Sequence, residues 1–171
     1  YPDAATRFQC ALLTGAPVRR VNLLCNLPDE ELSPAALAAR VVLQKTSSGG
    51  VGSFAFSLTN ADPADESLIT TTAGTAVTGS VVHAVTAMDQ DVSITEASQP
   101  GYVLTGASCT DSNASLTGNP TGALGTLSGN VLTIPADNVK PGASFVCSFT
   151  NGKLPTLSLS KVANGGNDTF G

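Results

Sequence analysis

The chain has 171 residues, a formal net charge of -5 and 42% hydrophobic residues, which is enough apolar content for one good-sized domain with a core. Its 8 Lys and Arg residues form no cluster that would hold a polyanion, which argues against nucleic acid as a partner. No apolar run is long enough to span a membrane, and Tyr1-Pro2-Asp3 does not resemble the start of a signal peptide, so we expect a mature, soluble chain.

The first forty residues differ from the rest of the chain and predict an appendage. Cys10 and Cys25 flank a turn at residues 14–17, a pattern that indicates a disulfide-bonded hairpin. Ser33 fits the N-cap of a helix and Pro34 its first position, and an alanine-rich run follows. Residues 1–40 are therefore predicted to form a disulfide hairpin followed by a short helix.

From Val41 onward the chain alternates apolar and polar residues, with Gly, Asn and Pro between the alternating runs. A charged fraction of only 12% and the absence of Trp agree with short strands joined by tight turns. Strands at this spacing are typical of an all-β, immunoglobulin-like sandwich. The predicted strands cover residues 41–46, 52–59, 67–71, 75–87, 91–96, 101–108, 130–134 and 143–150.

The cysteines indicate disulfides and an oxidising compartment. Cys10, Cys25, Cys109 and Cys147 lack the Cys-x-x-Cys or Cys/His spacing of a zinc or redox site, so no metal is expected. Sequence neighbourhood favours Cys10 with Cys25 and Cys109 with Cys147, although three connectivities are formally open. Such bonds persist in a periplasm or outside a cell, so we expect a secreted protein at the cell surface.

Residues 43–54 recur as residues 159–170, with Leu, Lys, two glycines and Phe kept in register. A first strand without the rest of its sandwich has unpaired backbone groups and an unburied apolar face, so it should seek a partner sheet. We expect either that more sequence follows or that this tail docks on a neighbour. The residues expected in this assembly strand are Leu157, Leu159, Lys161 and Phe170.

Three elements, in order and spacing, resemble a SpaA-like pilin repeat of the Cna protein B-type. They are Leu43-x-Lys45, Ile94-Thr95-Glu96 followed by Gln99-Pro100-Gly101-Tyr102, and Phe145-x-Cys147-x-Phe149-Thr150-Asn151. The resemblance is closest to the cysteine-containing variants. It implies a prealbumin-like β-sandwich at residues 41–153 whose first and last strands lie side by side. Residues 154–171 would be a linker followed by the first strand of a next repeat or a donor strand.

The same resemblance implies an isopeptide bond between Lys45 and Asn151. A lysine amine buried between two sheets has a lowered pKa, which makes its nucleophilic form accessible. Glu96 would hydrogen-bond the Asn151 amide oxygen and shuttle protons as ammonia leaves. In the alternative, Lys45 and Glu96 are solvated charges at strand ends, Asn151-Gly152 is a turn dipeptide, and the disulfide replaces the covalent bond. A single self-modification would not make the protein an enzyme.

Other polar residues receive a structural interpretation. His83, the only histidine, is expected to be a surface or half-buried strand residue rather than a ligand. Asp62, Asp65 and Glu66 meet no calcium spacing rule and are expected to be solvated. Asn60 is a competing asparagine, but it lies after the second predicted strand and lacks the position that the resemblance requires.

Three functions stay open. The first and favoured one is a structural module of an extracellular bacterial fibre or repetitive surface protein, with copies of itself or adjacent repeats as partners. The second is a filament subunit that polymerises by strand addition of residues 156–171. The third is an adhesin or carbohydrate-binding module, which the few aromatic residues, mostly at core-like positions, scarcely support. No nucleophile has a histidine partner in a convincing context and no cofactor fingerprint is present, so neither an enzyme nor a cofactor is expected.

Overall fold

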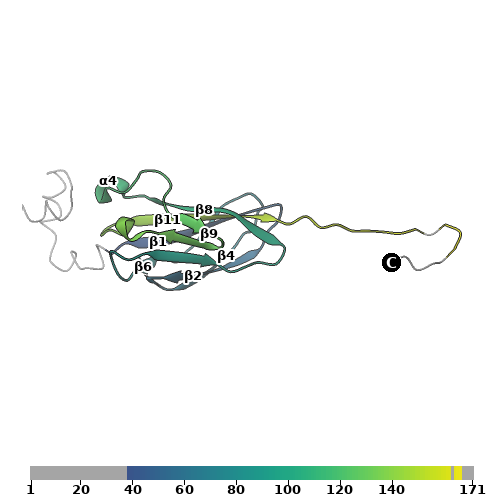
Figure 1. The fold of residues 1–171 in the computed structure, drawn as a ribbon, viewed down its shortest axis with the longest axis horizontal. Helices are drawn as coiled ribbons and strands as arrows, with labels where there is room; N and C mark the ends of the chain where they lie inside the picture. The colour runs from purple at the N-terminus through teal and green to yellow at the C-terminus, as the bar shows by residue number, and fades with distance from the viewer. Residues whose placement is uncertain (1–37, 163, 167–171) are drawn as a thin grey trace, which may run out of the picture.

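The structure is a computed structural model that describes residues 38–162 and 164–166. The predicted Cys10–Cys25 hairpin and most of the predicted short helix lie outside the described residues. Ala38 and Ala39, the last residues of the predicted helix, are not helical, and Arg40, assigned to the appendage, begins the first strand. In Figure 1 the described strands form a sandwich elongated along one axis, and the chain leaves it as an extended tail.

The described part of the chain contains eleven strands in two sheets, which confirms the all-β sandwich. The first sheet has the order β3-β6-β1-β11-β8, with β5 also paired to β1, and the second has the order β4-β2-β7-β10-β9. The strands are β1 (Arg40–Ser48), β2 (Ser53–Thr59), β3 (Ala61–Asp62), β4 (Asp65–Ile69), β5 (Val77–Thr78), β6 (His83–Val85), β7 (Val92–Glu96), β8 (Tyr102–Asp111), β9 (Thr126–Ser128), β10 (Val131–Ile134) and β11 (Ser144–Lys153). A short helix α4 (Ala114–Thr117) and a 3₁₀ turn (Ala136–Asn138) complete the described fold.

The first and last strands of the sandwich lie side by side. β1 pairs with β11 in parallel, with Lys45 opposite Phe149 and Ser47 opposite Asn151. On its other side β11 pairs antiparallel with β8, so the last strand lies between two strands that precede it in the chain. Because β1 and β11 run in the same direction, the chain enters the sandwich at one end and leaves it at the other (Figure 1).

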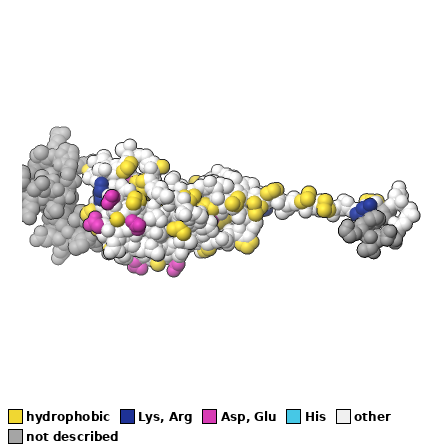
Figure 2. All heavy atoms as spheres, in the orientation of Figure 1, with side chains coloured by type: hydrophobic (Ala, Val, Ile, Leu, Met, Phe, Trp, Pro, Cys, Tyr) yellow, Lys and Arg dark blue, Asp and Glu magenta, His cyan; other side chains and the backbone are white. Residues whose placement is uncertain are grey.

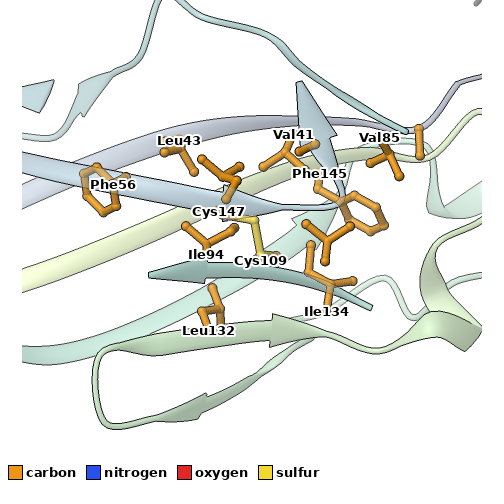
Figure 3. Close-up of a cluster of buried hydrophobic side chains, with 14 of the residues drawn as sticks. Val41, Leu43, Phe56, Val85, Ile94, Cys109, Leu132, Ile134, Phe145 and Cys147 are labelled. Atoms are coloured by element: carbon orange, nitrogen blue, oxygen red, sulfur yellow. A yellow bond between two sulfur atoms is a disulfide. The ribbon is translucent and has the colours of Figure 1, made fainter. Parts of the chain in front are cut away.

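The core lies between the inward faces of the two sheets. Alternating residues of β1, β2, β7, β10 and β11 are buried, as the period of two in a half-buried strand requires. Figure 3 shows Leu43, Ile94, Leu132 and Phe145 converging on this space from both sheets. Full burial of side chains of this size contributes roughly 1.5–3 kcal/mol each, so the packing of the two faces fixes the register of the strands.

One predicted strand is wrong. Residues 75–87 do not form a single strand, but give β5 and β6, which pair with different parts of β1. Between them the Gly79 amide donates a backbone hydrogen bond to the Leu43 carbonyl oxygen of β1 at 2.8 Å. β9 and α4 were not predicted, because elements of three and four residues are too short to show a periodicity.

Candidate functional site

The fold brings Lys45, Glu96 and Asn151 together inside the sandwich. Lys45 follows Val41 and Leu43 on the inward face of β1, and Glu96 ends β7 in the opposite sheet. Asn151 lies near the end of β11, two residues before the strand ends. The exposed fractions are 0% for Lys45, 3% for Glu96 and 2% for Asn151, so all three polar groups are enclosed by the core.

The three side chains form a closed set of hydrogen bonds. The Lys45 Nζ donates to Glu96 Oε2 at 2.7 Å and also to the Asn151 amide oxygen, Oδ1. The Asn151 Nδ2 donates to Glu96 Oε1 at 2.5 Å. Glu96 therefore contacts the amide nitrogen of Asn151, whereas the sequence had led us to expect contact with the amide oxygen. That oxygen is bonded by the Lys45 amine.

The surroundings of the Lys45 amine are apolar. Its Nζ lies 4.3 Å from the centroid of the Phe54 ring and 5.9 Å from that of Phe56. Burial lowers the pKa of Lys45 below its ordinary value of 10.5, against the raising effect of the hydrogen bond and the charge of Glu96. The alternative in which Lys45 and Glu96 are solvated at strand ends is thus wrong, and Asn151-Gly152 is part of β11 rather than a turn.

A disulfide joins Cys109 of β8 to Cys147 of β11, the pair that the sequence favoured. The two residues are directly opposite each other in the antiparallel ladder, and both are fully buried in the core (Figure 3). The last strand of the sandwich therefore carries both Cys147 and the candidate electrophile Asn151. Cys10 and Cys25 lie outside the described residues.

His83 and Glu66 form a second buried polar pair, which corrects two expectations. His83 is fully buried in β6, with Nε2 3.2 Å from Glu66 Oε2 and Nδ1 2.5 Å from the Pro63 carbonyl oxygen. Glu66 occupies an inward position of β4 and also accepts a hydrogen bond from the Val81 amide. In the described part of the chain no group of three or more His, Cys, Asp or Glu residues is placed to hold a metal.

A buried carboxylate outside this set was missed by sequence reasoning. Asp111 is 6% exposed, and its oxygens accept four hydrogen bonds that fasten the segment after β8 to the start of β11. The donors are the backbone amides of Asn113 and Ser144, the Thr117 hydroxyl and the Asn119 side chain. Although burial raises the pKa of Asp111, these hydrogen bonds together lower it below 3.8. No motif marks the site, because its members lie at the end of β8, on the segment that follows β8 and at the start of β11.

The remaining candidate residues lie apart from Lys45. The Asn60 side chain donates to the Ala87 carbonyl oxygen at 2.8 Å and accepts from the Ala87 amide at 2.7 Å, so it fixes a loop. In the tail, Leu157 and Leu159 are 86% and 88% exposed, and no strand includes residues 154–162. Lys161 belongs to this described tail, whereas Phe170 lies outside the described residues.

Comparison with known families places the fold. The family model SpaA_4, described as a prealbumin-like fold domain, matches residues 41–153. The chain belongs to this family. The match confirms the resemblance noted from the sequence and the prealbumin-like character of the sandwich. The matched residues run from the second residue of β1 to the last residue of β11.

Two solved structures illustrate what this family member resembles. The major pilin protein T-13 of Streptococcus pyogenes is 14% identical, with a TM-score of 0.39, over 68% of this chain and 45% of that one. The major pilin protein T3.2 of the same species is 13% identical, with a TM-score of 0.38 and the same coverage. This chain thus spans less than half the length of either pilin. Comparison with curated proteins found no match. Among the described residues, no helix has the length and apolarity to cross a bilayer.

Proposed function

We propose that this prealbumin-like domain is a structural module of an extracellular fibre or repetitive surface protein, locked by an isopeptide bond between Lys45 and Asn151. One observation carries the proposal. A buried lysine amine is in hydrogen-bond contact with the side-chain amide of Asn151 and with the carboxylate of Glu96, in a core that excludes water. A slow transamidation requires that the amine and the amide lie close together and that the amine is desolvated.

The reaction is a transamidation that balances without a cofactor. The neutral Lys45 Nζ attacks the Asn151 side-chain carbonyl carbon, a new C–N bond forms, and the bond from that carbon to Nδ2 breaks. Glu96 accepts a proton from Nζ and delivers one to the departing nitrogen, which leaves as ammonia. Its two oxygens lie 2.7 Å from Nζ and 2.5 Å from Nδ2, so one carboxylate reaches both the donor and the leaving group. The domain would modify itself once and would not turn over.

The parallel pairing of β1 and β11 gives the bond a mechanical role. The chain enters at Arg40 and leaves at Lys153, at opposite ends of the sandwich, so tension on the chain would shear these two strands. A bond between residues 45 and 151 would transmit that load directly from one strand to its neighbour. The segment between them, which includes the disulfide, would then be shielded from unfolding.

Two other functions are weighed against this one. Four phenylalanines of the described residues are buried and Tyr102 is half-buried, which leaves no exposed aromatic platform there for a carbohydrate. A filament subunit that donates residues 156–171 to a neighbouring sheet is the second candidate, favoured by the exposed leucines of the tail and by the position of β8 at a sheet edge.

The disulfide in the core supports an oxidising, extracellular location.

The test is the intact mass of the reduced chain, followed by peptide mapping. We expect a mass lower by one ammonia and a cross-linked peptide that contains Lys45 and Asn151. Glu96→Gln should restore the full mass, whereas Glu66→Gln, at a second glutamate that is buried in the described part of the chain, should leave the cross-link in place. An unmodified wild-type mass would refute the covalent part of the proposal.

A further inference from the structure

Strand β8 contains a β-bulge beside the candidate electrophile. In its pairing with β11, Gly106 lies opposite Thr150, whereas Leu104 lies opposite Asn151, so Thr105 is an extra residue between the two pairs. The disulfide fixes the register of these two strands on the Gly106 side of the bulge. A regular ladder continued from that register would place Thr105 opposite Asn151. The bulge therefore decides which residue of β8 lies beside Asn151.

The bulge also reverses the two faces of β8. On the disulfide side the odd-numbered residues face the core, as the full burial of Cys109 shows. On the other side the even-numbered Tyr102 and Leu104 pack against the core, whereas Val103 is exposed. One extra residue has this effect because successive side chains of a strand point to opposite faces. Without the bulge the Tyr102 ring would point away from the core.

The inward position of Tyr102 supports the lysine. Its ring meets the Phe54 ring edge-on, with 5.2 Å between the centroids, and its hydroxyl donates to the Val51 carbonyl oxygen at 2.7 Å. The Phe54 ring in turn lies 4.3 Å from the Lys45 Nζ. The tyrosine is held at both ends and packs against the aromatic ring that contacts the amine. The bulge thus acts on Lys45 through two aromatic side chains.

Thr105 itself holds the backbone around Asn151. Its hydroxyl donates to the Thr150 carbonyl oxygen at 2.9 Å, and this carbonyl belongs to the peptide unit that leads into Asn151. Its methyl group would lie 3.5 Å from a Cβ placed on Gly152. Thr105 therefore lies against the chain both before and after Asn151, and it supplies a hydrogen bond where the bulge interrupts the ladder.

Surface charge does little of this positioning. In Figure 2 the acidic side chains visible on this face lie over the half of the sandwich away from the tail, whereas Asn151 lies near the end of β11 from which the tail leaves. Exposed charges farther apart than about 10 Å are largely screened at moderate ionic strength. The alignment of the amine and the amide therefore depends on packing and hydrogen bonds within the fold.

We propose that the bulge at Thr105 positions both reactants of the transamidation. Its hydroxyl holds the backbone that carries Asn151, and the reversed face of β8 turns Tyr102 against the Phe54 ring that contacts the Lys45 amine. Thr105 is a positioning residue, because it exchanges no proton with the reacting atoms. A reaction between two groups held by the fold is slowed by small misplacements. This inference rests on the proposed isopeptide bond and names the residue that aligns its two partners.

The experiment follows the loss of ammonia with time in the full chain. The 171-residue chain is made by cell-free synthesis under oxidising conditions, and translation is then stopped. Intact mass reports cross-linking, and resistance to a protease reports folding. Thr105→Val keeps the shape of the side chain without its hydroxyl. It should slow the loss of ammonia from the folded chain about fivefold, the factor that corresponds to a hydrogen bond of about 1 kcal/mol. Thr105→Ser restores the hydroxyl and should react at nearly the wild-type rate.

A second pair of variants and a matched control complete the comparison. Tyr102→Leu should slow the reaction by a similar factor, whereas Tyr102→Phe keeps the ring and should stay closer to the wild type. Thr110→Val changes another exposed threonine of β8 and should leave the rate unchanged. A merely structural role of Thr105 would lower the melting temperature of Thr105→Val without changing the rate.

Two results would separate this inference from the proposed function. Wild-type and Thr105→Val chains that fold and lose ammonia at equal rates would overturn the positioning role and leave the isopeptide bond in place. Equal slowing by Thr105→Val and Thr110→Val would overturn it as well. A wild-type chain that folds and never loses ammonia would instead overturn the proposed bond, and the positioning role with it.

Discussion

The Glu96→Gln substitution tests how much the proposed cross-link stabilises the domain. Glutamine has the shape of glutamate and keeps a carbonyl oxygen for the Lys45 amine, but it cannot carry a proton from Nζ to the leaving nitrogen. The variant should therefore fold with the same sandwich and remain uncross-linked. Asn151→Ala removes the electrophile instead and keeps the Lys45–Glu96 ion pair, whose atoms are 2.7 Å apart.

The expected loss of stability in the uncross-linked variants follows from the entropy of loop closure in the unfolded chain. The proposed bond joins residues separated by 106 positions. A cross-link across a loop of that length restricts the unfolded chain by about 5 kcal/mol in the chain-entropy model. For a domain of this size 1 kcal/mol shifts the melting temperature by about 4 °C, so the uncross-linked variants should melt about 20 °C lower.

Differential scanning calorimetry with the disulfide intact in every sample measures this difference. The melting temperature should fall by a similar amount in both variants, because both lack the same covalent cross-link for different chemical reasons. Glu66→Gln controls for the loss of a buried carboxylate and should keep the cross-linked mass. A wild-type protein that carries the cross-link, but melts within a few degrees of both variants, would refute the loop-closure reasoning.

Three further perturbations probe other parts of the fold. Reduction and alkylation of the disulfide, which spans 38 positions, should cost about 4 kcal/mol in urea unfolding, and an unchanged midpoint would contradict that role. Because the pKa of Asp111 is lowered in the folded state, its carboxylate stabilises the fold above pH 3.8, and this contribution is lost as the pH falls from 3.8 through the folded pKa. Asp111→Asn should therefore flatten the free energy of unfolding as a function of pH in this acidic range. An unchanged pH dependence of the variant would disprove a stabilising role of the Asp111 carboxylate. Gly79→Ala would place a Cβ 2.4 Å from Glu66 Oε1 and should lower the melting temperature, whereas Gly106→Ala meets no atom within 4 Å and should be tolerated; equal effects would show that the Glu66 contact does not limit this site.

Much of the sandwich could be predicted because its strands alternate. The period of two in β1, β2, β7 and β10 is visible in the sequence, and each has one buried face as expected. Lys45 and Glu96 could be placed inward by the same alternation once a family resemblance marked them. Composition gave no such help for residues 75–87, since pairing with two different parts of β1 depends on tertiary contacts rather than on local pattern.

Buried polar pairs were harder to predict from the sequence than the strands. From the sequence, Glu66 was one of three neighbouring acidic residues expected to be solvated. Its place at an inward position of β4 makes it face His83 inside the sandwich instead. Asp111 acquires its hydrogen bonds from residues as far away as Ser144, and no sequence spacing announces such a contact. A partner distant in the chain makes these groups stable when buried, so reasoning from the single sequence assigned Glu66 to solvent and His83 to a surface or half-buried position.

The position of β11 between β1 and β8 has a consequence for the order of assembly. The strand is the last of the sandwich to be made, yet it occupies an interior place in its sheet, so earlier strands must leave a gap until it arrives. Cys147 and Asn151 both lie on it. A chain cut short before this strand would therefore receive neither the disulfide nor the proposed amide. Formation of the disulfide and of the proposed amide bond would thus be restricted to domains whose last strand has been synthesised and inserted into the sheet.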